Sequence, residues 1–373
     1  MPEPATIVVN ERRTPRIPVP TGEARSTAFH RRLPGYAPSP LVDVPDLAAR
    51  YGLARCSVKD ESRRLGLPSF KILGASWATY CVLVERLGTE PEWDDVSALR
   101  TALAPLGALT LVAATDGNHG RAVAHMANLL GYPARILVPG GTADARITAI
   151  EGEGATVTVV DGTYDDAVAA SAALAADDVL VVSDTSWPGY TTVPRWVIDG
   201  YATIFAEVAV QVAASGAPQP DVVFVPMGVG ALTSAAVEHS PAGARIVAVE
   251  PVDAACGLES VAAGHPVTVP GPHRSIMAGL NCGNVSDIAW PFLRDGVDAF
   301  VAVTDADAEA AMRDLAAHGI VAGETGAASL AGLAAVAGAG PGAAGFDLAG
   351  AHALVLVTEG ATDPVSYARI VGP

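Results

Sequence analysis

The stretch Ser69-Phe70-Lys71-Ile72-Leu73-Gly74-Ala75 holds one of only two lysines in the chain, against 21 arginines. A lysine amine can lose its proton and form an imine with an aldehyde, whereas an arginine guanidinium cannot. Apolar neighbours favour the neutral amine, and the small Gly74 and Ala75 leave room for a ligand. The stretch therefore predicts an imine-forming lysine at Lys71; the alternative is an ordinary surface lysine at the start of a helix.

The second lysine, Lys59, lies in Ser57-Val58-Lys59-Asp60-Glu61 at the end of a predicted strand. Two acidic residues follow it directly, and their negative charges favour its protonated form. We therefore expect Lys59 to be a charged, ion-paired lysine.

The composition is that of a soluble enzyme with one large or two medium domains, because the chain has 373 residues, 50% of them hydrophobic. Its net charge of −17 argues against nucleic-acid binding. No segment reaches the roughly 18 uncharged apolar residues of a membrane helix, and residues 1–32 lack the apolar core of a signal peptide, so we expect a cytoplasmic protein. No two cysteines form a C-x-x-C pair, so no metal site is predicted; they are Cys56, Cys81, Cys256 and Cys282.

Two runs of alternating strands and helices predict an α/β fold with mostly parallel sheets, because the strands are continuously apolar. The first run has predicted strands at 109–115, 134–138, 156–160 and 179–183. The second has predicted strands at 221–226, 245–250, 301–303 and 353–358. Residues 1–40 are rich in proline and are expected to form an irregular arm.

The turn Thr115-Asp116-Gly117-Asn118-His119-Gly120 follows a predicted strand and opens a predicted helix. Ligands of parallel sheets gather at the carboxyl ends of strands, and a helix N-terminus offers backbone N–H groups to an anion. Asn118 is a candidate donor to a cofactor oxygen. Asp116 is unusual there, since a carboxylate repels an anion; the alternative is an ordinary helix cap.

A second turn of this kind contains Gly228, Val229, Gly230, Ala231 and Leu232. Its glycines and the helix that follows them predict a phosphate-binding loop. The alternative for the same residues is an ordinary strand-to-helix turn. Two further strand ends carry polar side chains, at Asp184 and at Thr358. A hydroxyl such as that of Thr358 can meet a ring nitrogen. Glu324 is interpreted as an acid in the first turn of a helix.

The order of these motifs resembles the fold-type II family of pyridoxal-phosphate enzymes, which includes threonine dehydratase, tryptophan synthase β and cysteine synthase. Five stretches are similar, more closely, to diaminopropionate ammonia-lyases: LPSFKILG at 67–74, TDGNHG at 115–120, DTSWPGY at 184–190, IMAGLNCG at 276–283 and TEGATDP at 358–364. The resemblance runs from about Tyr36 to the C-terminus. Dehydratases of this fold usually have Ser where this chain has Asp116. Pro68 and the Ala-Leu end of the phosphate loop depart from the family pattern.

The resemblance implies two α/β domains with an active site in the cleft between them. The larger domain would comprise residues 1–75 and 190–373, and the smaller one residues 76–189. It also implies a homodimer, with the arm 1–35 contributing. Cys256 and Cys282 fall in similar stretches, so we expect them to lie close together as reduced thiols.

The resemblance further implies the cofactor pyridoxal 5′-phosphate, bound as an imine to Lys71. Its phosphate would lie on Gly228–Leu232, its ring hydroxyl near Asn118 and its ring nitrogen near Thr358. The implied reaction is α,β-elimination of D- or L-2,3-diaminopropionate, an amino-acid substrate, to pyruvate and ammonia through an aminoacrylate.

In such lyases a pair of carboxylates supplements the lysine. The resemblance thus implies Lys71, Asp116 and Asp184 as catalytic residues, and Thr115, Asp116 and Asp184 as substrate-binding residues. A carboxylate also suits a diamino acid, because it can pair with the second ammonium. Two alternatives stay open: a serine/threonine dehydratase or β-replacement enzyme on the same fold, and a non-catalytic relative that binds the cofactor.

Overall fold

The structure, a computed structural model, describes residues 5–15, 24–115 and 117–372. The fold is α/β with two mostly parallel sheets, as expected. The described residues group into two compact units. Unit 1 draws them from Met1–Gly22, Pro38–Arg63 and Ile204–Pro373, and unit 2 from Glu23–Ala37 and Arg64–Thr203.

Unit 1 is built on a seven-stranded sheet in the order β1-β10-β9-β8-β11-β3-β2. The five inner strands are parallel, and β1 and β2 pair antiparallel at the two edges. Strands β8, β10 and β11 are buried along their whole length, which explains their continuous apolar sequences. The strands are β1 Thr6–Val9, β2 Leu41–Asp43, β3 Arg55–Asp60, β8 Val222–Pro226, β9 Arg245–Pro251, β10 Ala299–Val303 and β11 His352–Val357.

The helices of unit 1 cover this sheet, and α13 packs against strands β8, β9, β10 and β11. They are α2 Pro45–Arg50, α9 Ala231–His239, α10 Cys256–Ala263, α11 Trp290–Gly296, α12 Asp305–Ala317, α13 Ala328–Ala339 and α14 Pro364–Val371.

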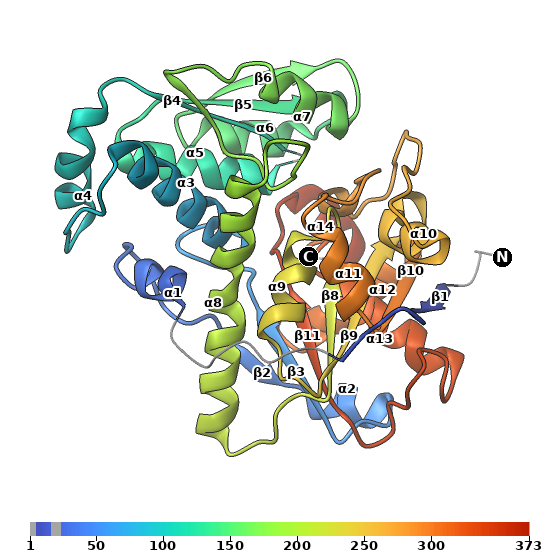
Figure 1. The fold of residues 1–373 in the computed structure, drawn as a ribbon. Helices are drawn as coiled ribbons and strands as arrows, with labels where there is room; N and C mark the ends of the chain where they lie inside the picture. Colours follow the sequence, from blue (N-terminus) through green and yellow to red (C-terminus); the bar gives the residue numbers. More distant parts are fainter. Residues whose placement is uncertain (1–4, 16–23, 116, 373) are drawn as a thin grey trace. The chain divides into compact units, whose positions relative to one another are not determined.

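Unit 2 is built on a four-stranded sheet, all parallel, in the order β6-β5-β4-β7, with β4, β5 and β6 drawn in green in Figure 1. The strands are β4 Thr110–Ala114, β5 Ala134–Pro139, β6 Thr156–Val160 and β7 Val179–Val181. The helices are α1 Arg25–His30, α3 Lys71–Leu87, α4 Val96–Leu103, α5 Asn118–Leu130, α6 Asp144–Glu151 and α7 Tyr164–Ala172. Helix α8, Thr192–Ser215, begins in unit 2 and ends in unit 1.

The expectation of an irregular segment over residues 1–40 is wrong for Thr6–Val9 and Arg25–His30. Thr6–Val9 pairs antiparallel with β10, and Arg25–His30 forms helix α1. The four residues of β1 are β-branched and therefore suit a strand. Their partner strand lies almost 300 residues later in the chain, so only the folded chain supplies it.

The boundaries of the two units differ from those of the domains predicted from the sequence. Residues 24–37, 64–75 and 190–203, expected in the larger domain, pack within unit 2. The reason is a close crossing of α3 and α8, where a Cβ on Gly200 would lie 2.5 Å from the Leu73 carbonyl oxygen. The first turn of α3 is thereby joined to the first half of α8.

Within the described residues, α8 is the one helix whose length and composition would allow it to cross a membrane. Of its most apolar window, 61% is buried inside the fold, as in the core helix of a globular protein. Arg195, Asp199 and Glu207 interrupt its apolar sequence, so it has no run of 18 uncharged residues.

Candidate active site

A tight turn sets the start of the helix that carries Lys71. The backbone N–H groups of Arg64 and Leu67 donate to each other's carbonyls over 2.7 and 2.9 Å. Between them, Leu65 has φ 51° and Gly66 has φ 83°. A left-handed leucine is unfavourable, but the Leu65 side chain is only 7% exposed, so its burial offsets the backbone cost. Lys71 then begins α3 as its first residue.

Lys71 forms an ion pair with Asp184. Its Nζ donates to Asp184 Oδ2 over 2.6 Å, and the hydroxyl of Tyr164 donates to Asp184 Oδ1 over 3.0 Å. His119 Nδ1 lies 3.9 Å from Asp184 Oδ2. Burial disfavours the charged carboxylate, but the adjacent Lys71 and His119 and the two hydrogen bonds outweigh it, so the pKa of Asp184 lies well below its usual value.

The expected apolar setting of Lys71 is thus wrong in one respect. Phe70 does lie beside it, with Nζ 5.7 Å from the ring centroid, but the nearest charged group is a buried carboxylate. The Lys71 side chain is 19% exposed, and that of Asp184 is 4% exposed. The lysine is thus the more exposed member of the pair.

The hydroxyl of Tyr190 holds the backbone just before Asp184. It accepts a hydrogen bond from the N–H of Ser183 and donates to the carbonyl of Val181. The turn from Trp187 to Tyr190 is closed by backbone hydrogen bonds between these two residues, whose rings stack 4.1 Å apart. The side chain of Asp184 is thereby fixed at the carboxyl end of β7.

The predicted turn at 115–118 lies on the same sheet edge, because β4 and β7 are parallel neighbours. Thr115 is fully buried, and its Oγ1 accepts a hydrogen bond from the N–H of Gly117. Asn118 is the first residue of α5, and His119 Nε2 lies 2.8 Å from the carbonyl oxygen of Val182. Asp116, predicted to bind substrate and to act in catalysis, lies outside the described residues.

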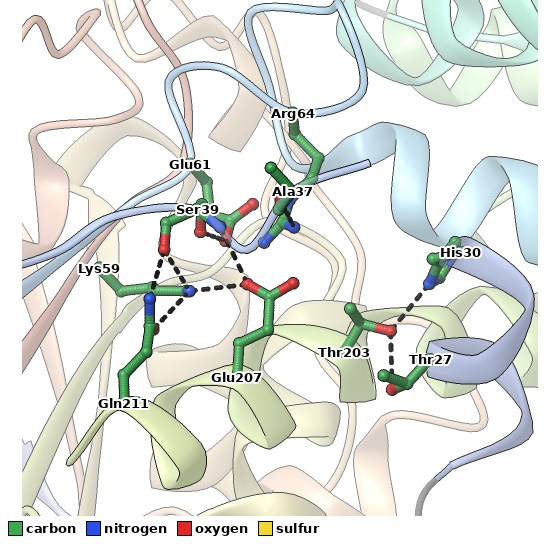
Figure 2. A network of polar contacts seen from close by, with 10 residues as sticks. All are labelled: Thr27, His30, Ala37, Ser39, Lys59, Glu61, Arg64, Thr203, Glu207 and Gln211. Atoms are coloured by element: carbon green, nitrogen blue, oxygen red, sulfur yellow. Dashed lines mark hydrogen bonds and ion pairs between the residues drawn. The ribbon is translucent and has the colours of Figure 1, made fainter. Parts of the chain in front are cut away.

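Lys59 is charged and ion-paired, as expected, and Glu207, which is distant in the sequence, is one of its partners. Its Nζ donates to Glu207 Oε2 over 2.7 Å, to Gln211 Oε1 over 3.0 Å and to the carbonyl of Ser39 over 2.9 Å. Figure 2 shows these groups around the lysine, whose side chain is fully buried. A buried ammonium with a carboxylate and two further acceptors is a structural ion pair, so Lys71 is the better candidate for imine formation.

In unit 1, the predicted phosphate loop leads from β8 into α9. Gly230 caps α9 with φ 99°, a conformation that favours glycine, and the helix begins at Ala231. The first turn of such a helix presents backbone N–H groups to an anion. Thr233 also belongs to this turn: its buried Oγ1 has no hydrogen-bond partner among the described residues. The sequence interpretation missed Thr233 because it ended the loop at Leu232.

Two cysteines flank the start of this loop. The Sγ of Cys256 donates to the Gly228 carbonyl at 3.8 Å, and a Cβ on Gly228 would lie 3.1 Å from the Sγ of Cys282. Both are free thiols, as are Cys56 and Cys81. Both thiols thus lie beside the same residue, and their reduced state stays a prediction. Because Gly228 has no side chain, both thiols can approach its backbone.

Thr358 lies on the same sheet edge as this loop, because it follows β11, the parallel neighbour of β8. It is 2% exposed, and its Oγ1 has no hydrogen-bond partner among the described residues. The adjacent segment 323–326 packs against it, with the Gly323 N–H donating to the carbonyl of Glu359. Glu324, interpreted from sequence as a first-turn acid, is buried in this segment and precedes α13 by several residues.

Comparison with known proteins identifies the class of this chain. Residues 32–345 match the family described as "Pyridoxal-phosphate dependent enzyme", so the chain belongs to that family. It is 38% identical over 319 residues to a diaminopropionate ammonia-lyase of Escherichia coli, covering 83% of this chain and 79% of the relative. It is 35% identical over 379 residues to that of Salmonella typhimurium, covering 92% and 90%. Within the class, the chain belongs to the diaminopropionate ammonia-lyases.

The fold agrees with this assignment. The crystal structure of the Escherichia coli diaminopropionate ammonia-lyase in complex with D-serine matches with a TM-score of 0.89. The match has 34% sequence identity and covers 98% of this chain and 96% of the other.

Each unit, taken by itself, contains groups whose chemistry fits part of pyridoxal phosphate. In unit 2, Lys71 has an amine of the kind that its aldehyde needs. Its phosphate needs N–H and hydroxyl donors, which the first turn of α9 and Thr233 supply. Its ring nitrogen needs one hydrogen-bonding group, and Thr358 Oγ1 is such a group. A buried hydroxyl without a partner costs about 1–3 kcal/mol, so Thr233 and Thr358 fit the place of a polar ligand.

Proposed function

We propose that this chain catalyses the α,β-elimination of 2,3-diaminopropionate to pyruvate and ammonia with pyridoxal phosphate. The observation that carries the proposal is the Lys71–Asp184 pair, with 2.6 Å between Nζ and Oδ2, in a chain of this family. Elimination requires one group to remove the α-proton and one to supply a proton to the departing amine. A lysine and a carboxylate that share a proton can exchange these tasks.

The cofactor-binding roles follow from the fit of the residues. Pyridoxal phosphate, when bound, supplies an aldehyde for the amine and a ring that withdraws electrons from the α-carbon. Gly228, Val229, Gly230, Ala231 and Leu232 bind its phosphate with Thr233. Asn118 meets the ring hydroxyl, and Thr358 hydrogen-bonds the ring nitrogen without a charge.

Two carboxylates act with Lys71 on the substrate. Asp184 exchanges protons with the lysine, which its ion pair with Lys71 supports. Asp116, beside Thr115, binds the second ammonium of the substrate and handles the α-proton of one enantiomer, while Lys71 handles the other. An ionised carboxylate binds an ammonium well, which favours a diamino acid over serine.

A panel of D- and L-diaminopropionate, serine and threonine tests the function, with pyruvate, 2-oxobutyrate and ammonia measured. We expect diaminopropionate to be the best substrate. Asp184→Asn and Asp116→Asn should keep the cofactor absorbance yet lose diaminopropionate turnover by on the order of 10²-fold, the scale of a general base. Serine turnover should fall less, because serine has no second ammonium. Unchanged diaminopropionate turnover in both variants would make a serine/threonine dehydratase the better assignment.

We also propose that the protein works in the cytoplasm as a homodimer, without nucleic-acid or membrane partners. The net charge of −17 and the burial of α8 support the absence of such partners. The dimer is supported by the resemblance of the chain to its family. Light scattering at micromolar concentration tests it, and a monomer mass would contradict it.

A further inference from the structure

A row of hydroxyl groups connects the buried Asp184 with the surface of unit 2. The hydroxyl of Tyr164, the first residue of α7, donates to Asp184 Oδ1 over 3.0 Å and lies 3.3 Å from Thr185 Oγ1. Asp184 is 3% exposed, whereas Tyr164 and Thr185 are half-buried. Tyr164 was not predicted from the sequence, because it lies 20 residues before Asp184 in a helix of its own.

The chemistry of the three groups fixes the direction of their hydrogens. An ionised carboxylate only accepts hydrogen bonds, so the Tyr164 hydrogen points to Asp184. The contact between Tyr164 and Thr185 then has Thr185 as its donor. On the far side of the carboxylate, Oδ2 accepts from Lys71. Both hydroxyls therefore donate in the same direction: Thr185 donates to Tyr164, and Tyr164 donates to Asp184.

We propose that Thr185 and Tyr164 form a proton path between solvent and the Asp184–Lys71 pair, a step that rests on the proposed function. A solvent proton binds the oxygen of Thr185 as the Thr185 proton passes to the oxygen of Tyr164. At the same time the Tyr164 proton passes to Oδ1 of Asp184. Both hydroxyls are neutral before and after the transfer, and the carboxylate gains one proton. The reverse direction releases a proton to solvent.

Elimination consumes and releases protons in every turnover, so the Asp184–Lys71 pair has to exchange them with solvent. Tyr164 acts through Asp184, and we therefore class it as a positioning residue. Its hydroxyl is not needed to hold the helix, because Thr163 and Asp166 form a complete capping box at the start of α7. Its ring packs beside Ala114, Ala167 and Val168, a contact that phenylalanine would keep.

The first experiment uses the apoenzyme and does not depend on turnover. Apoenzyme is mixed with pyridoxal phosphate in weak buffer containing a pH-indicator dye. Lys71 has to lose its proton to react with the aldehyde. The measurement is made at a pH where the imine nitrogen carries no proton, so that this proton is released and both imine absorbance and proton release report on it. We expect the two signals to rise together in the parent. In Tyr164→Phe the dye signal should lag by at least about tenfold, with the final imine absorbance unchanged.

Two further variants make this test specific. Thr185→Val interrupts the path one step closer to solvent and should give the same lag, which keeps the test valid if Tyr164→Phe folds poorly. Tyr132→Phe, whose hydroxyl meets the Leu103 carbonyl at 3.4 Å, should match the parent. Simultaneous signals in both Tyr164→Phe and Thr185→Val would overturn the proposal.

The second experiment follows turnover of diaminopropionate. Tyr164→Phe should lower kcat by about tenfold or more at unchanged KM and raise the solvent deuterium isotope effect. Added imidazole should restore part of the rate, because a small acid can replace a lost proton path. The absence of any such rescue, together with an unchanged isotope effect, would contradict the path. If the parent does not turn over diaminopropionate but the dye lag appears, the proposed function fails and the proton path stands.

Discussion

The two lysines differ in the surroundings of their ammonium groups. Lys59 is fully buried, and a carboxylate, an amide oxygen and a backbone carbonyl accept its hydrogen bonds. Lys71 is partly exposed and pairs with Asp184 at a strand end. Removing the proton from Lys59 would leave Glu207 buried beside a neutral amine. Lys71 can pass its proton to Asp184, which is itself connected to Tyr164.

This difference predicts opposite effects of two alanine variants. Lys71→Ala should abolish the imine absorbance of the enzyme loaded with pyridoxal phosphate. Lys59→Ala should keep the absorbance but lower the free energy of unfolding by about 3–5 kcal/mol, because it removes one member of a buried ion pair and keeps the other. Absorbance spectra and denaturant unfolding measure both quantities.

A double variant serves as the control for Lys59. Lys59→Met combined with Glu207→Leu removes both charges of this pair and should recover much of the lost stability. If Lys59→Ala removed the imine absorbance and Lys71→Ala kept it, the assignment of the imine lysine would be reversed.

At the scale of elements, the position of Lys71 depends on how closely α3 crosses α8. A Cβ on Gly200 would lie 2.5 Å from the Leu73 carbonyl oxygen and 2.7 Å from Gly74 Cα. A Cβ on Gly74 would lie 2.6 Å from the ring of Tyr201. The first contact is with backbone, which cannot rotate away, whereas the second is with a side chain.

Gly200→Ala should therefore be the more damaging of the two substitutions. We expect it to lower the free energy of unfolding by about 1–3 kcal/mol, the usual cost of overpacking. It should also weaken the binding of pyridoxal phosphate, because it displaces the first turn of α3. Gly338→Ala is the matched control: this glycine of α13 has nothing within 4 Å of an added Cβ, and alanine should stabilise the helix by up to about 1 kcal/mol. Equal stabilities of Gly200→Ala and Gly338→Ala in urea unfolding would contradict this view of the crossing.

At the scale of the whole molecule, one buried acid couples stability to pH. Glu250 is fully buried at the end of β9. Its carboxylate accepts hydrogen bonds from the N–H groups of Gly257 and Leu258. Burial raises the pKa of Glu250 to about 8. The two backbone hydrogen bonds and one from Cys256 act in the opposite direction, and the charge of Glu259 adds a small rise. Between its ordinary pKa and about 8, the folded protein binds a proton that the unfolded chain has lost.

The stability due to this proton is fully present below the ordinary pKa of a glutamate and is lost as the pH rises to about 8. The difference in unfolding free energy between the parent and Glu250→Gln should therefore fall as the pH rises from 5 to 8, since glutamine does not titrate. Urea unfolding at several pH values measures this difference. A difference that stays constant over this range would contradict the raised pKa.

The sequence by itself determined the features that depend on neighbouring residues. Apolar runs between helices predicted both parallel sheets, because a strand buried on two faces is apolar throughout. The ends of these runs located the residues of the candidate site at Asn118, Asp184, Gly228 and Thr358. Lys71 was distinguished from Lys59 by the chemistry of the residues beside each.

Only the tertiary structure decided which distant groups meet. Lys59 pairs with Glu207, 148 residues later, a partner that its sequence neighbours do not predict. Likewise, the pairing of β1 with β10 and the hydrogen bond from Tyr164 to Asp184 join segments with no local relation. Such contacts follow from the order of strands in a sheet and from the crossing of helices. These are set by packing of the whole chain, which no short stretch of sequence contains.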